Sequence, residues 1–186
     1  IAITCGAGAV GGAAVAVPFV ASFAPSERAK AAGAPVQADI SALRPGEKMT
    51  VEWRGKPVWI VRRTEEQLAA LPKLDGQLAD PFSKRNPAEL TPEYARNVPR
   101  SIKPEVLVCV GICSHLGCSP VDRFAPGAQP SLPDDWAGGF LCPCHGSTFD
   151  MAGRVFKNKP APDNLEVPRH MYLSDTLLLI GEDSKG

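Results

Sequence analysis

Two short runs that combine cysteine with histidine constrain this chain more than any other feature of its sequence. The first is Cys113–Cys118 (C-S-H-L-G-C) and the second is Cys142–Ser147 (C-P-C-H-G-S). Each run supplies two cysteines and one histidine, so thiolate and imidazole donors from both runs can ligate one metal centre. Two cysteines then remain. A fold that uses these donors must bring two loops together, although 26 residues separate His115 from Cys142.

Two Cys and two His are compatible with more than one kind of site. A structural zinc ion usually takes like ligands in pairs, C-x₂₋₄-C followed by H-x₃₋₅-H, whereas each half-site here mixes Cys with His. Zinc also leaves Cys118 and Cys144 unexplained. A [2Fe-2S] centre with two Cys on one iron and two His on the other fits the mixture better. Ser147, two residues after His145, adds a hydroxyl that can reach a cluster sulfur. The pattern therefore favours this iron–sulfur centre over zinc and over a framework made only of disulfides.

From Leu107 to about Gly181 the chain resembles the Rieske subunit of ubiquinol–cytochrome c reductase, the cytochrome bc complex of bacteria and mitochondria. The matching stretches are C-S-H-L-G-C, C-P-C-H-G-S-T-F-D and the later Pro-Ala-Pro at 160–162. The N-terminal apolar segment fits the same family. The resemblance implies a mainly β fold, namely an antiparallel β-sandwich Rieske domain with a cluster-binding subdomain, preceded by one transmembrane helix.

The resemblance also implies a role for each residue of the two runs. The metal ligands are two thiolates on the inner iron and two imidazoles on the outer iron: Cys113, Cys142, His115 and His145. The other two cysteines form a Cys118–Cys144 disulfide. Ser147 joins the cofactor contacts. His145 and His115 are the candidate catalytic residues, because an imidazole on the outer iron can accept the proton of a hydroquinone, and His145 is expected to face the quinol.

Three features depart from the family pattern. Most respiratory members carry Tyr where Phe149 stands, and the Tyr hydroxyl donates to a cluster cysteine sulfur. A glycine usually precedes the Pro-Ala-Pro run, and here the residue is Lys159. The segment 119–141 is longer than in mitochondrial forms. None of these changes removes a ligand, but each bears on the potential or on the docking surface.

Charge and cysteine content limit the surroundings in which the chain works. Lys+Arg and Asp+Glu both number 20, so nothing indicates a nucleic-acid partner or a polybasic membrane patch. A disulfide among the six cysteines implies an oxidising compartment. Cys5 and Cys109 lie outside the two runs and are expected to be buried small hydrophobes. His170 is expected to be an ordinary strand residue.

Residues 1–24 contain no charge, and we expect them to form a transmembrane anchor. As a helix they measure roughly 36 Å, against a bilayer core of about 30 Å. A cleaved signal segment is the alternative, although its apolar region would run only about 7–15 residues. Alanine and glycine make the segment only modestly hydrophobic. Residues 25–38 are expected to be a flexible hinge, with a short helix from Ser26 through Ala32.

The domain is expected over 39–186, with its cluster-binding loops at about 111–163. A hairpin is predicted around the turn Arg54–Pro57, and a short helix is predicted between Thr64 as N-cap and Pro72 as stop. The stretch Asp75–Arg100 has the composition of a surface excursion. Further strands are predicted at Glu105–Val110, Gly139–Leu141, Arg154–Lys157, Leu165–Val167, Met171–Leu173 and Thr176–Ile180.

The sequence therefore predicts the electron-transfer subunit of a quinol–cytochrome c oxidoreductase. It takes one electron from quinol at a cytochrome b subunit and passes it to a c-type cytochrome subunit, with proton release. The resemblance places it in the bacterial inner membrane as a single-pass protein, with the cluster domain on the periplasmic side of a dimeric complex. The alternative is the Rieske subunit of a periplasmic molybdenum enzyme similar to arsenite oxidase, which also tolerates Phe at position 149.

Overall fold

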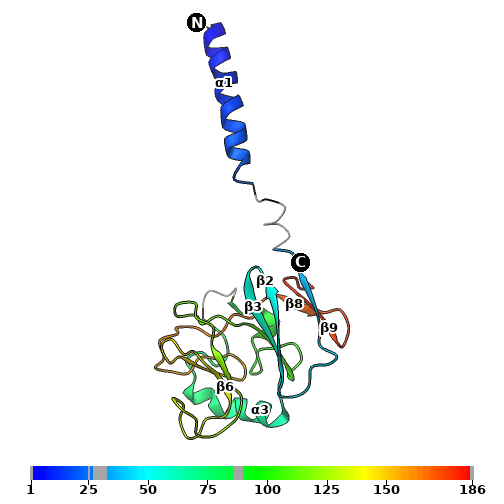
Figure 1. Cartoon of the computed structure of the whole chain (residues 1–186), viewed down its shortest axis with the longest axis vertical. Coiled ribbons are helices and arrows are strands. Elements are labelled where there is room, and N and C mark those ends of the chain that lie inside the picture. The colour runs from blue at the N-terminus through cyan, green and yellow to red at the C-terminus, as the bar shows by residue number, and fades with distance from the viewer. Residues whose placement is uncertain (1, 25, 27–32, 86–89, 185–186) are drawn as a thin grey trace. The chain divides into compact units, whose positions relative to one another are not determined.

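The computed structural model describes residues 2–24, 26, 33–85 and 90–184, and it divides the chain into two compact units, 1–34 and 35–186. The first unit contains helix α1 (Ala2–Ala21), which includes Pro18 (Figure 1). Within the described residues, no helix is both long enough and apolar enough to cross a membrane. The segment 1–24, where an anchor was expected, forms a helix over Ala2–Ala21 that is more than half alanine and glycine. Cys5 is exposed on this helix, so its expected burial is wrong.

Half of the expected hinge, including all of the helix expected through Ala32 except its first residue, lies outside the described residues. The second unit begins at Pro35, and strand β1 (Val36–Asp39) already pairs with another strand. The last residues of the 25–38 segment therefore belong to the domain.

The second unit is mainly β, and every strand pair in its described part is antiparallel. The described residues of this unit form three three-stranded sheets, in the orders β1-β9-β8, β2-β3-β4 and β5-β6-β7. The remaining strands are β2 (Lys48–Trp53), β3 (Lys56–Arg62), β4 (Val106–Val110), β5 (Val121–Arg123), β6 (Gly139–Leu141), β7 (Thr148–Asp150), β8 (His170–Tyr172) and β9 (Leu177–Ile180).

The β2-β3-β4 sheet separates two hydrophobic cores, because successive side chains of a strand point to opposite faces. On β3, Val58 and Ile60 pack into one core, whereas Trp59 and Val61 pack into the other. The first, here called the base core, comprises Ala38, Ile40, Leu43, Trp53, Val58, Ile60, Val106, Val108, Val110, Leu178 and Ile180. The second, here called the cysteine core, comprises Trp59, Val61, Leu71, Leu107, Cys109, Cys113, Phe140, Cys142, Phe149, Met151, Ala152, Val155, Ala161 and Leu165.

The predicted hairpin is confirmed, and its turn is a tight one. Arg54 and Gly55 join β2 to β3, and both have positive φ angles, 52° and 69°. Two consecutive positive φ values give a backbone twist that matches the twist of the flanking strands. At the same end of the sheet, Gly111 follows β4 and its N–H donates to Pro57 O at 2.8 Å. Gly111 lies against Trp59, where an added Cβ would meet Trp59 Cε2 at 2.1 Å.

The predicted short helix is also confirmed. Helix α3 (Glu65–Ala70) begins with a capping box, in which the Thr64 side chain accepts from the Gln67 N–H and the Gln67 side chain accepts from the Thr64 N–H. Pro72 does not stop the chain from coiling, since the 3₁₀ helix η1 (Leu71–Gln77) follows at once. Proline at the first turn of a helix loses no hydrogen bond, which explains the continuation.

Two expectations for the loops are wrong. The stretch Asp75–Arg100 is not simply a surface excursion, because it contains the short 3₁₀ helix η3 (Glu93–Ala95) and ends in Arg100, which is fully buried. The strands predicted at Arg154–Lys157 and Leu165–Val167 are replaced by isolated bridges and single backbone hydrogen bonds. These segments bond to several different neighbours in turn, so no continuous ladder forms.

Candidate metal centre

The two Cys-His loops have the same backbone construction. In the first, which follows β4, the Cys113 N–H donates to Cys118 O at 2.8 Å and the Gly117 N–H donates to Cys113 O at 3.1 Å. In the second, the Cys142 N–H donates to Ser147 O at 2.7 Å and the Gly146 N–H donates to Cys142 O at 3.0 Å. The second loop lies between β6 and β7. In both loops the first cysteine is buried, whereas residues 116–117 and 143–146 are exposed.

Glycine is required at the same place in both turns. Gly117 has φ 79° and Gly146 has φ 73°, a region that residues with a Cβ rarely adopt. A left-handed residue at this point folds the chain back, so that the fifth residue of the loop donates to the carbonyl of the first. The glycines therefore set the direction of the cysteine and histidine side chains that precede them.

The two histidines come together at the tips of the loops. The ring centroids of His115 and His145 lie 4.7 Å apart and the rings are nearly perpendicular, at 86°. His145 is exposed and His115 is half-buried. The Nδ1 atom of His115 is buried and has no hydrogen-bond partner among the described residues. A buried polar nitrogen without a partner is costly, and coordination to a metal removes that cost.

The first cysteine of each loop is a free thiol. Cys113 and Cys142 are both 2 % exposed, and both belong to the cysteine core. Burial raises the pKa of the Cys113 thiol because it disfavours the thiolate. The neighbouring Cys142 sulfur also raises this pKa, whereas hydrogen bonds from the His115 backbone and the Ser147 hydroxyl lower it. A cation bound between the two sulfurs would supply the missing positive charge.

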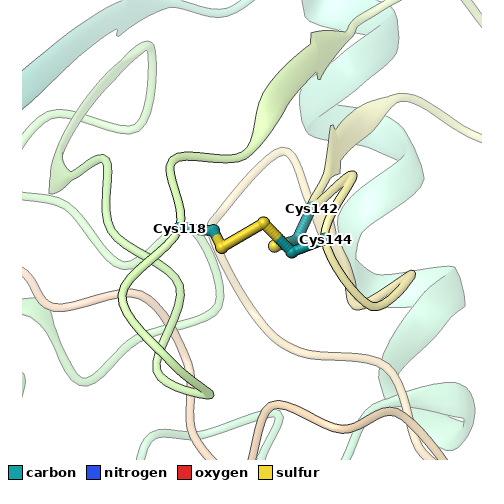
Figure 2. A group of neighbouring side chains, drawn as sticks. All are labelled: Cys118, Cys142 and Cys144. Atoms are coloured by element: carbon teal, nitrogen blue, oxygen red, sulfur yellow. A yellow bond between two sulfur atoms is a disulfide. The ribbon is translucent and has the colours of Figure 1, made fainter.

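The remaining two loop cysteines form the disulfide Cys118–Cys144, the pair that the family resemblance implies, with Cα atoms 6.6 Å apart. Figure 2 shows it beside Cys142, and the three sulfur atoms lie within 4.8 Å of one another. That spacing suits a metal site by distance alone. However, metals bind thiolates, and sulfurs joined in a disulfide do not supply them. The available donors are therefore two thiols and two imidazoles, a set that fits a [2Fe-2S] centre with mixed ligation.

Pro160–Pro162 and the following Asp163 form a third wall that is fastened to both loops. The Ala161 N–H donates to Ser147 Oγ at 2.9 Å, so the hydroxyl proton of Ser147 remains free for the Cys113 sulfur. Ser114 Oγ donates to Asp163 O at 2.7 Å. Sequence reasoning singled out Ser147 but missed Ser114. The one available signal was a hydroxyl directly after a ligand cysteine.

The departures from the family pattern occupy different places. Phe149 is fully buried on β7 and packs in the cysteine core with the two free thiols. Lys159 lines an open cavity of about 330 Å³, together with Trp136 and Phe156. The long segment 119–141 folds around Trp136, whose Nε1 donates to Arg123 O at 2.8 Å. The part of this segment that follows β5 is therefore bonded back to that strand.

Cys109 and His170, for which no chemical role was expected, are both buried in strands. Cys109 is fully buried on β4, and burial raises its pKa to about 12. His170 is buried on β8, where its Nδ1 lies 2.8 Å from Pro168 O. Burial lowers the pKa of His170, and Tyr94 packs edge-on against its ring. Neither residue lies in the two Cys-His loops.

Comparisons with known proteins agree with this geometry. Residues 86–169 match the family model described as the Rieske [2Fe-2S] domain. The chain is 58% identical over 183 residues to the ubiquinol-cytochrome c reductase iron-sulfur subunit of Allochromatium vinosum, covering 98% of this chain and 86% of that protein. It is 40% identical over 179 residues to the subunit of the same name from Bradyrhizobium diazoefficiens, covering 96% and 89%. Among solved structures it is similar to a chain of a hyperthermophilic respiratory Complex III, with TM-score 0.50, 26% identity, and coverage of 95% and 98%.

Proposed function

Because the chain belongs to the family of ubiquinol–cytochrome c reductase iron–sulfur subunits, we propose that four side chains of its two loops hold the family's Rieske [2Fe-2S] cluster: Cys113, Cys142, His115 and His145. The observation that carries this proposal is the buried, unpartnered Nδ1 of His115. It lies in the loop that begins with one of the two free buried thiols, and its ring lies 4.7 Å from that of His145. The molybdenum-enzyme alternative is not favoured by the relatives.

When bound, the cluster supplies transfer of one electron at high potential, because two neutral imidazoles replace two anionic thiolates. The chain's own residues do the rest. His145 is exposed at the tip of its loop, so the ring nitrogen that faces away from the metal can accept a proton from quinol. His115 is half-buried and has the smaller access to substrate. We therefore assign the proton-accepting role to His145 and a mainly ligating role to His115.

The surroundings of the thiols keep water out and stabilise charge on sulfur. Ser147 accepts from Ala161 and donates to Cys113, so its hydroxyl is oriented toward the sulfur rather than toward solvent. The Cys118–Cys144 disulfide joins the two loops on their outer side. Since both loops start in the cysteine core, the ligands are held by packed strands and not by the exposed tips alone.

The partners follow from the proposed reaction. We assign a quinol and a cytochrome b subunit on one side of the transfer, a c-type cytochrome subunit on the other, and a dimeric complex in the bacterial inner membrane. The disulfide supports an oxidising, periplasmic position for the domain. Helix α1 is uncharged and its large apolar side chains are exposed, so its glycine-rich face suits close packing on a helix of the membrane-embedded partner.

Replacing the ligands one at a time tests the assignment. Changing Cys113, His115, Cys142 or His145 to Ala should abolish the Rieske EPR signal of the purified subunit, because in each variant one of the two irons would lose a ligand. Cys109→Ala is the matched control, since Cys109 is also a buried free thiol and lies four residues before Cys113. It should keep the full signal. A ligand variant that retains a complete cluster would overturn the assignment for that residue.

A further inference from the structure

Three sulfur atoms from the two loops lie close enough for chemistry among themselves. Cys118 and Cys144 are joined, and Cys142 is a free, buried thiol. All three sulfurs lie within 4.8 Å of one another, and Figure 2 shows the Cys142 side chain directed toward the disulfide. The proposed function uses Cys142 as an iron ligand and the disulfide as a bridge between the loops. It leaves open what the third sulfur does when no iron holds it.

We propose that an unligated Cys142 exchanges with the Cys118–Cys144 disulfide, and that iron ligation prevents this exchange. A thiolate attacks a disulfide sulfur and displaces the other one. Here the Cys142 sulfur, having lost its proton, forms a bond to Cys118 Sγ as the Cys118–Cys144 bond breaks. The bonding electron pair leaves on Cys144, which takes up the proton. One disulfide and one thiol are present before and after, so the step needs no external oxidant.

Attack at Cys118 is favoured over attack at Cys144. A bond from Cys142 to Cys144 would join residues only two apart, across Pro143, in a small strained ring. A Cys118–Cys142 bond spans 142 − 118 = 24 positions, close to the 26 of the existing disulfide. Loop-closure entropy is therefore nearly unchanged. The displaced Cys144 is exposed, so its sulfur leaves into water.

The exchange couples the disulfide to the occupancy of the metal site. The new bond consumes Cys142, so a chain that has exchanged lacks one ligand and cannot take up a complete cluster. Conversely, iron bound to Cys142 keeps that sulfur away from the disulfide. Loss of the cluster thus locks the empty site, and reduction of the new disulfide is needed to open it. This inference rests on Cys142 being a ligand, as proposed above.

Disulfide mapping during cluster loss tests the exchange. The purified full chain with its cluster is treated with an iron chelator under anaerobic, thiol-free conditions and then alkylated with iodoacetamide at intervals. Fragmentation mass spectrometry assigns each modified cysteine. Before chelation only Cys118–Cys144 should be found. After chelation, alkylated Cys144 and a cross-linked Cys118–Cys142 peptide should grow together to a plateau. A persistent Cys118–Cys144 bond with alkylated Cys142 would overturn the proposal.

Two variants separate the possible reasons for failure. Cys142→Ser cannot attack, so its disulfide should stay Cys118–Cys144 throughout. Cys109→Ala removes a buried free thiol that lies outside the two loops, and should exchange as the parent does. If Cys142→Ser lacks a cluster but the parent shows no exchange, only this inference falls. If Cys142→Ser retains a full Rieske EPR signal, the ligand assignment itself falls.

Reconstitution gives a second readout of the lock. Apo-protein that has been left to exchange should recover far less EPR signal with iron and sulfide than freshly prepared apo-protein does. Treatment of the aged apo-protein with a dithiol reductant before reconstitution should raise its recovery to that of the fresh apo-protein. Equal recovery from aged and fresh apo-protein, with the exchanged disulfide present in the aged sample, would show that the exchange does not block the site.

Discussion

The two cores that share the β2-β3-β4 sheet are held together in different ways. The base core is built from aliphatic side chains and Trp53. The cysteine core is enclosed by three buried arginines that donate to backbone carbonyls of its members. Arg63 donates to Met151 O, Arg100 to Ala152 O and Leu165 O, and Arg154 to Leu71 O.

The difference indicates what each core is for. An aliphatic core needs only the right volume, and it tolerates exchange of similar side chains. Guanidinium groups that bond to carbonyls fix the course of the backbone itself, because each donor has a set direction. The cysteine core carries the loops that hold the ligands, and its arginines attach segments around them to one another. The backbone is therefore fixed most firmly around the loops that carry the proposed metal ligands.

The largest expected effect comes from the ion pair on the cysteine side. Asp150 is fully buried, and its two oxygens accept from the Arg154 side chain and from the Ala152 and Arg154 N–H groups. Asp150→Ala removes the fully buried partner of the Arg154 guanidinium, which keeps Asp75 as its other carboxylate, and leaves two backbone N–H groups without this acceptor. The change should lower the free energy of unfolding by about 3–5 kcal/mol. Denaturant unfolding measures this change. Asp175→Ala, which breaks the exposed Lys103–Asp175 pair, should leave the unfolding midpoint nearly unchanged. Similar losses of unfolding free energy in both variants would contradict the expected difference between the buried and the exposed ion pair.

A pH-dependent difference is expected between neighbouring residues of β4. Burial raises the pKa of Cys109 to about 12 from 9.0, so the unfolded chain ionises first. Its contribution to stability is fully present below pH 9 and is lost as pH rises toward 12, by up to about 4 kcal/mol. Cys109→Ala should flatten the alkaline fall in unfolding free energy. Val108→Ala, which faces the base core, should lower stability equally at pH 8 and pH 11. A parallel response of the two variants would contradict the burial argument.

A smaller effect is expected on the reduction potential from Ser147. Its hydroxyl donates to the Cys113 sulfur and so stabilises the more negative, reduced cluster. A hydrogen bond is worth roughly 0.5–1.5 kcal/mol, and about 59 mV corresponds to a tenfold change for one electron. Ser147→Ala should therefore lower the midpoint by about 20–65 mV in a redox titration. Ser114→Ala is the matched control, because its hydroxyl donates to Asp163 O. An unchanged midpoint in Ser147→Ala would remove Ser147 from the sulfur contacts.

Phe149 offers the converse change, at or below the same size. Phe149→Tyr adds a hydroxyl within the cysteine core, where a buried O–H needs a partner. If that partner is a cluster sulfur, the midpoint should rise by no more than about 20–65 mV. Redox titration with EPR detection gives the shift. A midpoint equal to that of the parent, with the cluster intact, would mean that position 149 does not face a ligand sulfur.

The parts of the fold that depend on local sequence could be predicted. The alternating residues of β3 and β4, the turn at Gly55 and the capping box at Thr64 all follow from short-range rules. The metal site could be predicted from the two Cys-His loops, because few metal centres use that mixture of cysteine and histidine ligands. The pairing of Cys118 with Cys144 came from family resemblance and not from the residues alone.

The buried arginines could not be predicted, and the reason is physical. Arg100 ends a stretch rich in proline, asparagine and charge, which is the composition of exposed loops. Its burial depends on acceptors from Ser83, Thr91, Ala152, Gly153 and Leu165, which are distant from it in sequence. Only the complete fold brings acceptors from these separate segments together around one guanidinium group. The same holds for Ser114, whose partner Asp163 belongs to the third wall.

The contact between Gly111 and Trp59 has a consequence for how such chains can diverge. A methyl group at position 111 would overlap the indole ring, so neither position can change freely while the other stays as it is. A lineage that enlarges residue 111 must first, or at the same time, shrink residue 59. The two sites should therefore drift as a pair, and a hybrid that joins residue 59 of one descendant to residue 111 of another should often fail to fold.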